Sequence, residues 1–242
     1  MVARPPLAVP LVSLAGLLAL LGLVLADWAP LDRFDLAVSG ALRAYGTANP
    51  DVVAALRVAT DVAATFSYLL AGLVASTLLV LRRQRAPAVL CAAATAVVPL
   101  LWSLMHWLLL APRPTDGFVS IDSNGFPSGH TSNATAAGLV AVLLVWPRAG
   151  RAGRAVTVAA AMLVAGFVGF TRMALLAHWP ADVLGGWLLG LAVVPLLARL
   201  ATRGSPAARP PAAPVNPAAA APREPGSRPA PECADRAPPG SD

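Results

Sequence analysis

The chain holds three histidines, and one of them lies close to residues that can polarise it. His178 is followed four positions later by Asp182 and comes six positions after Arg172. Residues four apart share a helix face, so the carboxylate can accept a hydrogen bond from one ring nitrogen. The other nitrogen keeps a lone pair that can attack an electrophile, and a nearby guanidinium favours an anionic one. The spacing predicts nucleophilic chemistry on an anion such as phosphate, although a pair that only caps a helix would look the same.

The second histidine belongs to the stretch FPSGHTSN, residues 126–133. We expect Pro127 to end a loop and Ser128, Gly129 and His130 to begin a helix, where backbone N–H groups have no carbonyl partner and favour an anion. Glycine would let that anion approach closely, the serine hydroxyl would add a donor, and His130 could give a proton to a leaving oxygen. An ordinary Ser-Gly cap beside an incidental histidine is the alternative.

The third histidine, His106, comes seven residues before Arg113. Arg113 follows a long apolar run, so its guanidinium could simply extend to the membrane interface. Together with Arg172, it could instead hold the oxygens of a phosphate group. The sequence therefore predicts an anion site built from three separate segments.

Composition indicates a membrane protein. Of the 242 residues, 57% are hydrophobic and 12% are charged. A water-soluble globule of this composition would lack the polar residues to cover its surface. The net charge of +6 lies largely near the ends of apolar runs, which fits membrane anchoring and argues against a nucleic-acid partner.

The elements that must position these residues are long helices, because only helices and closed barrels satisfy the backbone in hydrocarbon. Six apolar runs are candidates: 7–26, 63–81, 88–110, 131–146, 155–170 and 181–200. We predict an all-α polytopic membrane protein, with six transmembrane helices forming a bundle in a domain over 1–201. Residues 27–62 mix apolar and charged positions and should form a short interfacial helical segment. Residues 202–242, rich in proline and alanine, should be a disordered cytoplasmic tail.

Arginines near the helix ends predict the orientation. One side of the predicted bundle receives Arg4, Arg82, Arg83, Arg85, Arg148, Arg151, Arg154, Arg199 and Arg203. Positively charged loops stay in the cytoplasm, so both termini should be cytoplasmic. The segments 27–62, 111–129 and 171–180 then face outward from the cell membrane. The predicted anion site lies on that extracytoplasmic face.

In order and spacing, the three motifs resemble the signatures of the type 2 phosphatidic acid phosphatase superfamily, which are Lys-x6-Arg-Pro, Pro-Ser-Gly-His and Ser-Arg-x5-His-x3-Asp. This chain has His106-x6-Arg113-Pro114, Pro127-Ser128-Gly129-His130 and Thr171-Arg172-x5-His178-x3-Asp182. Thr171 keeps the hydroxyl of the family's serine. His106 replaces a permanently charged lysine by an imidazole that is mostly neutral above about pH 6.5.

The resemblance implies a metal-independent phosphatase with no cofactor, acting through a phosphohistidine. His178 would attack phosphorus, Asp182 would orient it, and His130 would protonate the leaving group and then activate water. The phosphate would be bound by Arg113, Arg172, Ser128, Gly129 and His106. The substrate would be a phosphomonoester or pyrophosphate of a membrane lipid, such as polyprenyl pyrophosphate or phosphatidic acid, taken directly from the bilayer.

Other classes of protein fit the sequence less well. A six-helix transporter or channel is the main alternative, but the ionisable residues gather at one membrane face rather than along the helices. A metal-dependent hydrolase needs a carboxylate-rich ligand set, and Asp116, Asp122 and Asp182 are too few and badly spaced. The vanadium haloperoxidases share this anion site within the superfamily, but they resemble soluble proteins.

Overall fold

The computed structural model describes residues 2–62 and 64–203, and these form eight α-helices. They are α1 (Ala8–Leu25), α2 (Ala29–Ala48), α3 (Pro50–Val62), α4 (Thr65–Leu81), α5 (Arg85–Leu108), α6 (Gly129–Val145), α7 (Arg151–Ala174) and α8 (Pro180–Arg203). The predicted all-α class is confirmed. The predicted tail lies outside the described residues from 204 onward, while Thr202 and Arg203 belong to α8 and not to the tail.

Among the described residues, five segments are long and apolar enough to cross a membrane, which makes the protein a polytopic membrane protein. They are α1, the run Pro50–Leu81 that includes α4, α5, α7 and α8. The sixth predicted span, α6, is apolar but has only 17 residues. A helix of that length reaches about 26 Å at 1.5 Å per residue, somewhat less than a typical hydrocarbon core.

Several helices extend beyond the apolar runs that predicted them. Arg172 lies in the last turn of α7, beyond the end of the apolar run 155–170. At the other membrane face, α7 starts at Arg151 rather than at residue 155. Hydropathy marks only the part of a helix that lies in hydrocarbon, whereas the backbone hydrogen bonds continue through polar residues at the interface. The extra turn joins Arg172 rigidly to the membrane helix.

Small residues let α8 pack closely against α6. A Cβ atom added at Gly186 would lie 2.8 Å from the Ser128 carbonyl oxygen, and one at Gly190 would lie 2.6 Å from a methyl carbon of Thr135. In a membrane, helices associate by such close packing because lipid provides no hydrophobic drive between them. The contact holds the start of α8 against the start of α6.

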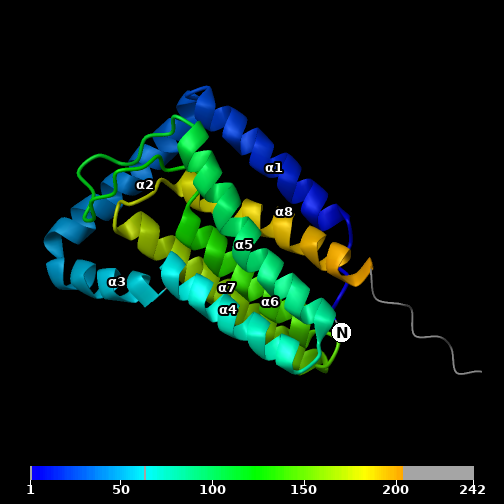
Figure 1. The fold of residues 1–242 in the computed structure, drawn as a ribbon. Helices are drawn as coiled ribbons and strands as arrows, with labels where there is room; N and C mark the ends of the chain where they lie inside the picture. Colours follow the sequence, from blue (N-terminus) through cyan, green and yellow to red (C-terminus); the bar gives the residue numbers. More distant parts are fainter. Residues whose placement is uncertain (1, 63, 204–242) are drawn as a thin grey trace, which may run out of the picture. The chain divides into compact units, whose positions relative to one another are not determined.

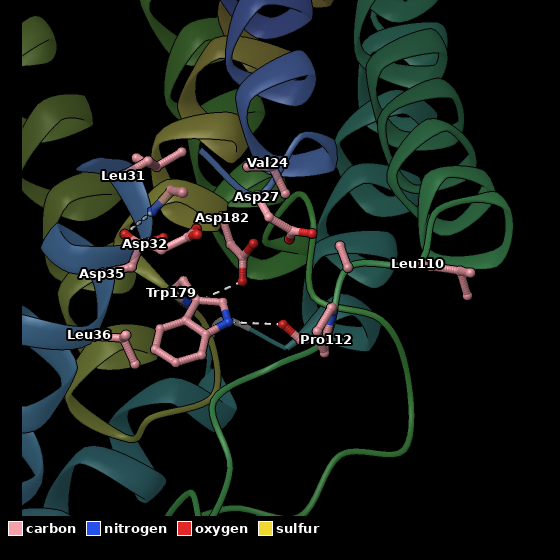
Figure 2. A pocket seen from close by; sticks show the side chains of 12 residues that line it. Val24, Asp27, Leu31, Asp32, Asp35, Leu36, Leu110, Pro112, Trp179 and Asp182 are labelled. Carbon is pink, nitrogen blue, oxygen red and sulfur yellow. Dashed lines mark hydrogen bonds between the residues drawn. The ribbon is translucent and has the colours of Figure 1, made fainter. Parts of the chain in front are cut away.

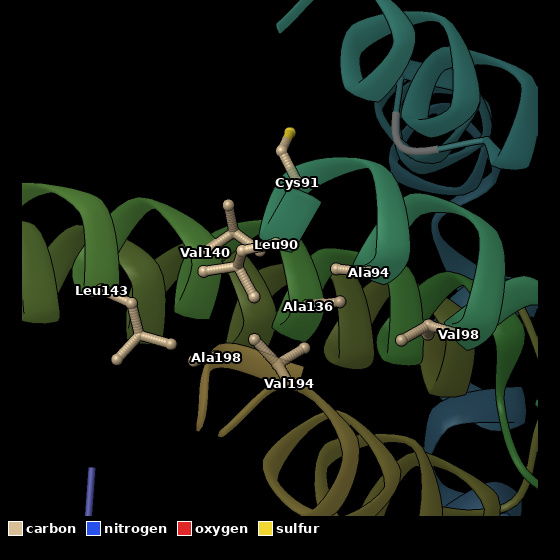
Figure 3. Packing of buried hydrophobic residues seen from close by; sticks show 9 residues of the cluster. All are labelled: Leu90, Cys91, Ala94, Val98, Ala136, Val140, Leu143, Val194 and Ala198. Carbon is tan, nitrogen blue, oxygen red and sulfur yellow. The ribbon is translucent and has the colours of Figure 1, made fainter. Parts of the chain in front are cut away.

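The core of the bundle is apolar and lies away from the predicted site. Figure 3 shows side chains of α5, α6 and α8 packed together, apart from Cys91, whose sulfur points away and lies 3.8 Å from the Gly72 carbonyl of α4. The cluster consists of Leu90, Cys91, Ala94, Val98, Ala136, Val140, Leu143, Val194 and Ala198. These residues occupy the first part of α5 and the later parts of α6 and α8, so the opposite ends of the three helices are left for polar residues.

The predicted interfacial segment forms two helices, α2 and α3, which lie at one end of the bundle beside the loop that joins α5 to α6 (Figure 1). Two arginines connect them to that loop. Arg43 donates to the carbonyl oxygens of Thr115 and Asp116, and Arg57 donates to that of Phe118. These helices therefore support the loop.

Candidate active site

The predicted site residues come together at the end of the bundle where α2 and α3 lie. His178 stands in the short segment between α7 and α8, and its side chain is 2% exposed. Asp182 belongs to the first turn of α8 and is equally buried. Pro180 starts that helix at a position where its missing N–H is not needed. The helix thus begins one residue before the predicted run 181–200.

His178 and Asp182 form a hydrogen-bonded pair. The distance from His178 Nδ1 to Asp182 Oδ2 is 3.2 Å, and the Trp179 amide donates to the same oxygen at 3.0 Å. Because a carboxylate oxygen only accepts, Nδ1 carries the proton and Nε2 has the lone pair. The pair thus fixes the tautomer that a nucleophilic Nε2 requires.

The surroundings of His178 keep its ring neutral. Burial lowers the pKa of His178 well below its usual 6.5, and the charges of Arg113 and Arg172 lower it further. A lowered pKa means that the ring stays unprotonated as the pH falls through 6.5. The contact with Asp182 is therefore a hydrogen bond from a neutral imidazole, and the lone pair on Nε2 is available at neutral pH.

Arg113 lies against the ring of His178. Its Nη1 atom is 2.8 Å from Nε2 and 3.3 Å from Nδ1, so it lies over the ring and not along the Nε2 lone pair, and it donates to the Ala177 carbonyl at 2.6 Å. The rest of the guanidinium is held by the loop before α6. Nε donates to the Ser123 carbonyl at 2.7 Å, and Nη2 donates to the Asn124 carbonyl at 2.9 Å. An anion that accepted a hydrogen bond from Nη1 would therefore lie beside Nε2.

Arg172 supplies a second cation in a buried position. It is 4% exposed, and its Nη1 donates to Thr60 Oγ1 at 3.1 Å. Its Nε is buried and has no hydrogen-bond partner within the described residues. Leaving such a donor unpaired costs about 1–3 kcal/mol, and more for a charged group. An anion at this position would remove that cost.

The start of α6 differs in detail from our expectation. The Ser128 amide is not free, because it donates to the Asp182 carbonyl at 2.9 Å. Gly129 packs against the indole of Trp102, because a Cβ atom added at Gly129 would lie 2.9 Å from that ring. Close helix packing therefore explains this glycine better than the approach of an anion. Within the described chain, no group accepts a hydrogen bond from the amide of Gly129 or His130.

The other two histidines border the same space. The His106 ring centre is 6.4 Å from that of His178, and His106 Nε2 lies 2.7 Å from the Pro127 carbonyl oxygen. A carbonyl only accepts, so Nε2 is protonated and its hydrogen is engaged by that carbonyl. His130, at the start of α6, is within electrostatic range of both Arg172 and Arg113. His130 could therefore face an anion held by the arginines, whereas His106 would have to use Nδ1.

A pocket of about 320 Å³ lies on the other side of Asp182 (Figure 2). It is lined by Val24, Asp27, Leu31, Asp32, Asp35, Leu36, Leu110, Ala111, Pro112, Trp179, Ala181 and Asp182. Figure 2 shows the three carboxylates of Asp27, Asp32 and Asp35 near that of Asp182. No arginine or lysine belongs to this lining, so an anion would be repelled there. The charges therefore favour an anion on the arginine side of the pair.

Asp35 belongs to the site region, although the sequence did not single it out. It is 8% exposed, and its Oδ1 accepts a hydrogen bond from the Ala181 amide at 3.1 Å. Burial raises the pKa of Asp35 from 3.8 to about 6. A carboxylate at the start of a helix is favoured by the helix dipole. Asp35 thus fixes the first turn of α8 next to Asp182.

Sequence reasoning also missed the groups that hold the arginines. The loop carbonyls at Ser123 and Asn124 leave no mark in residue types, because every residue has a carbonyl. Thr60 is an ordinary polar position in an amphipathic helix. A glycine in this loop, Gly125, was the available sign that the loop packs closely against the site. An added Cβ there would lie 2.8 Å from Asp182 Oδ2.

Fold and site together define a class of protein: a polytopic helical membrane protein with a buried histidine–aspartate pair beside two arginines. Residues 107–205 match the model of the PAP2 superfamily. This segment of the chain is thus similar to the family that the motifs predicted. The match contains both arginines and the pair, but it begins directly after His106.

Individual relatives agree with this assignment. Over 78 residues, the chain is 40% identical to phosphatidylglycerophosphatase B of Escherichia coli K12 and to that of Shigella flexneri. The aligned segment covers 32% of this chain and 29% of the length of those relatives. The fold is similar to the crystal structure of a transmembrane PAP2-type phosphatidylglycerolphosphate phosphatase from Bacillus subtilis. That comparison has a TM-score of 0.68 at 24% identity and covers 80% of this chain and 94% of the other.

Proposed function

We propose that the protein is a metal-independent lipid phosphatase that works through a phosphohistidine. One observation carries the proposal: the Nε2 atom of His178 lies 2.8 Å from the guanidinium of Arg113, while the Nε of Arg172 is buried without a hydrogen-bond partner among the described residues. A tetrahedral phosphate would satisfy both guanidinium groups and place its phosphorus in front of the nucleophile.

The proposed reaction has two steps. In the first, Nε2 of His178 forms a bond to phosphorus as the bond to the lipid oxygen breaks, and His130 donates a proton to that leaving oxygen. In the second, His130 takes a proton from a water molecule that attacks phosphorus, and the phosphorus–nitrogen bond breaks to release phosphate. Arg113 and Arg172 stabilise the charge on the equatorial oxygens, where it is spread in the transition state.

The proposed substrate is a phosphate or pyrophosphate carried by a membrane lipid. The site lies at an end of the membrane helices, so a head group can reach it while the chains stay in the bilayer. The names of the Escherichia coli and Shigella relatives put phosphatidylglycerophosphate first among the candidates. Phosphatidic acid and polyprenyl pyrophosphate present the same terminal group and remain in the proposal.

Phosphate release from a lipid panel tests this function. Purified protein in detergent should release inorganic phosphate from at least one of these three lipids, and EDTA should leave the rate unchanged. Among the described residues, no group of three or more His, Cys, Asp or Glu side chains is placed to hold a metal ion. Loss of the rate in EDTA with recovery on adding Mg²⁺ would favour a metal-dependent hydrolase. No release from any lipid would favour the transporter alternative.

We further propose that α6 crosses the membrane as a sixth span and that the site faces outward from the cell membrane. With six spans, the arginine-rich turns after α4 and α6 fall on the same side as both termini. Positively charged turns are retained in the cytoplasm. The loop between α5 and α6 and the segment between α7 and α8 then lie outside.

Cysteine labelling in intact cells tests this orientation. Asp122 and Arg151 are both exposed; Asp122 precedes α6 in the chain and Arg151 follows it. In a background with Cys91→Ala and Cys233→Ser, Asp122→Cys should react with a membrane-impermeant maleimide, and Arg151→Cys should react only after the cells are opened. The reverse pattern would place the site on the cytoplasmic face, and labelling of both from outside would contradict a spanning α6.

A further inference from the structure

Thr60 is remote from the three motifs in sequence, but its hydroxyl touches the buried arginine of the third motif. It lies near the end of α3 and is 4% exposed. Its Oγ1 accepts a hydrogen bond from Arg172 Nη1 at 3.1 Å across 112 positions of the chain. Within the described part of the chain, it is the one side chain that hydrogen-bonds to this guanidinium.

A second threonine orients the Thr60 hydroxyl. The Oγ1 atoms of Thr60 and Thr171 are 3.3 Å apart, and Thr171 Oγ1 donates to the Val168 carbonyl at 2.8 Å. Each hydroxyl has one hydrogen. Since the hydrogen of Thr171 serves the carbonyl, the hydrogen between the two oxygens comes from Thr60. The lone pairs of Thr60 are then left to face Arg172.

The contact also determines which edge of the guanidinium is available. Nη1 is engaged by α3, while the buried Nε has no partner among the described residues. A planar guanidinium held at one nitrogen keeps its other donors in fixed directions. The anchor on Thr60 therefore fixes the direction of the donor that is open to an anion.

We propose that Thr60 is a positioning residue that holds Arg172 for phosphate binding, so that α3 contributes to substrate affinity without touching the substrate. The inference rests on the proposed function, because it takes the anion at Arg172 to be a phosphate group. It assigns α3 a role in affinity that differs from supporting the loop between α5 and α6.

Orthovanadate binding to the full-length protein in detergent tests this role. The dissociation constant is obtained from the rise in the thermal unfolding midpoint with vanadate concentration. Thr60→Val removes the hydroxyl at nearly constant volume and should weaken binding about tenfold, the effect of losing one hydrogen bond to a charged group. Thr60→Ser keeps the hydroxyl and should stay within about twofold of the wild type. If the valine variant does not fold, Thr60→Ala makes the same comparison.

Two controls separate positioning from general structural damage. Thr157 donates to a carbonyl of its own helix near the other end of α7, so Thr157→Val should leave vanadate binding unchanged. In an Arg172→Lys background, Thr60→Val should weaken vanadate binding by less than half as much as in the wild type. The guanidinium that Thr60 holds is absent from that background.

Each outcome bears on one of the two proposals. Wild-type affinity in Thr60→Val, or equal weakening in Thr60→Val and Thr60→Ser, overturns the role of Thr60 while leaving the phosphatase proposal intact. A loss of the same size in the Arg172→Lys background shows that Thr60 acts elsewhere. A wild-type protein that neither binds vanadate nor releases phosphate contradicts the proposed function and this inference with it.

Discussion

Replacing His178 by alanine should abolish phosphate release while the protein stays folded. The variant removes the atom that would bond to phosphorus, and loss of a covalent nucleophile typically costs a factor of about 10⁴ or more in turnover. The binding groups remain, because Arg113 is held mainly by carbonyls of the loop and Arg172 by Thr60. Vanadate affinity should therefore fall much less than turnover. Initial rates and vanadate titrations on the same preparation measure both quantities.

His106→Ala is the matched control for this variant. It makes the same chemical change at a ring 6.4 Å away. His106 Nε2 is engaged by the Pro127 carbonyl, so we expect mainly a rise in KM of about tenfold and a smaller change in kcat. Turnover by His178→Ala near the wild-type rate would contradict the phosphohistidine mechanism. Equal losses in both variants would mean that the site tolerates no change in its histidines, whatever their role.

The sequence was sufficient to predict the membrane helices and the residues that gather at one end of them. Long apolar runs mark helices because the bilayer permits few other structures. The four-residue spacing of His178 and Asp182 predicted their hydrogen bond, since a helix start brings such positions together. These predictions depend on local geometry alone.

The contacts that orient the site depend on residues far apart in the chain, and local patterns contain no information about them. Asp35 reaches the Ala181 amide across 146 positions, and Thr60 reaches Thr171 across 111. The Ser128 amide was predicted to be free because its own helix offers no partner, but the Asp182 carbonyl of α8 accepts its hydrogen bond. The close packing of α6 against α8 brings that carbonyl within reach, and only the folded chain reveals it.

The carboxylate of Asp182 provides the second large effect. In Asp182→Asn, the amide oxygen should take the place of Oδ2, because the Trp179 amide at that position can only donate. The same oxygen can still accept from His178 Nδ1, so the tautomer is preserved and only the charge is lost. Nε2 becomes a cationic nitrogen when it bonds to phosphorus, and a carboxylate stabilises that charge. We expect turnover to fall about 10²- to 10⁴-fold, mostly in kcat.

Two further variants show whether the charge acts through His178. Asp182→Ala also leaves the Trp179 amide without its partner, so it should lower the free energy of unfolding by about 1–3 kcal/mol, whereas Asp182→Asn should stay close to the wild type.

Asp35→Asn removes a charge from the same helix start but keeps an acceptor for the Ala181 amide. Assayed at pH 8, where a pKa of about 6 leaves Asp35 ionised in the wild type, it should change turnover less than about fivefold. Equal losses in Asp35→Asn and Asp182→Asn would mean that α8 requires negative charge at its start in general. A large loss in Asp182→Asn alone assigns the effect to the carboxylate that is hydrogen-bonded to His178.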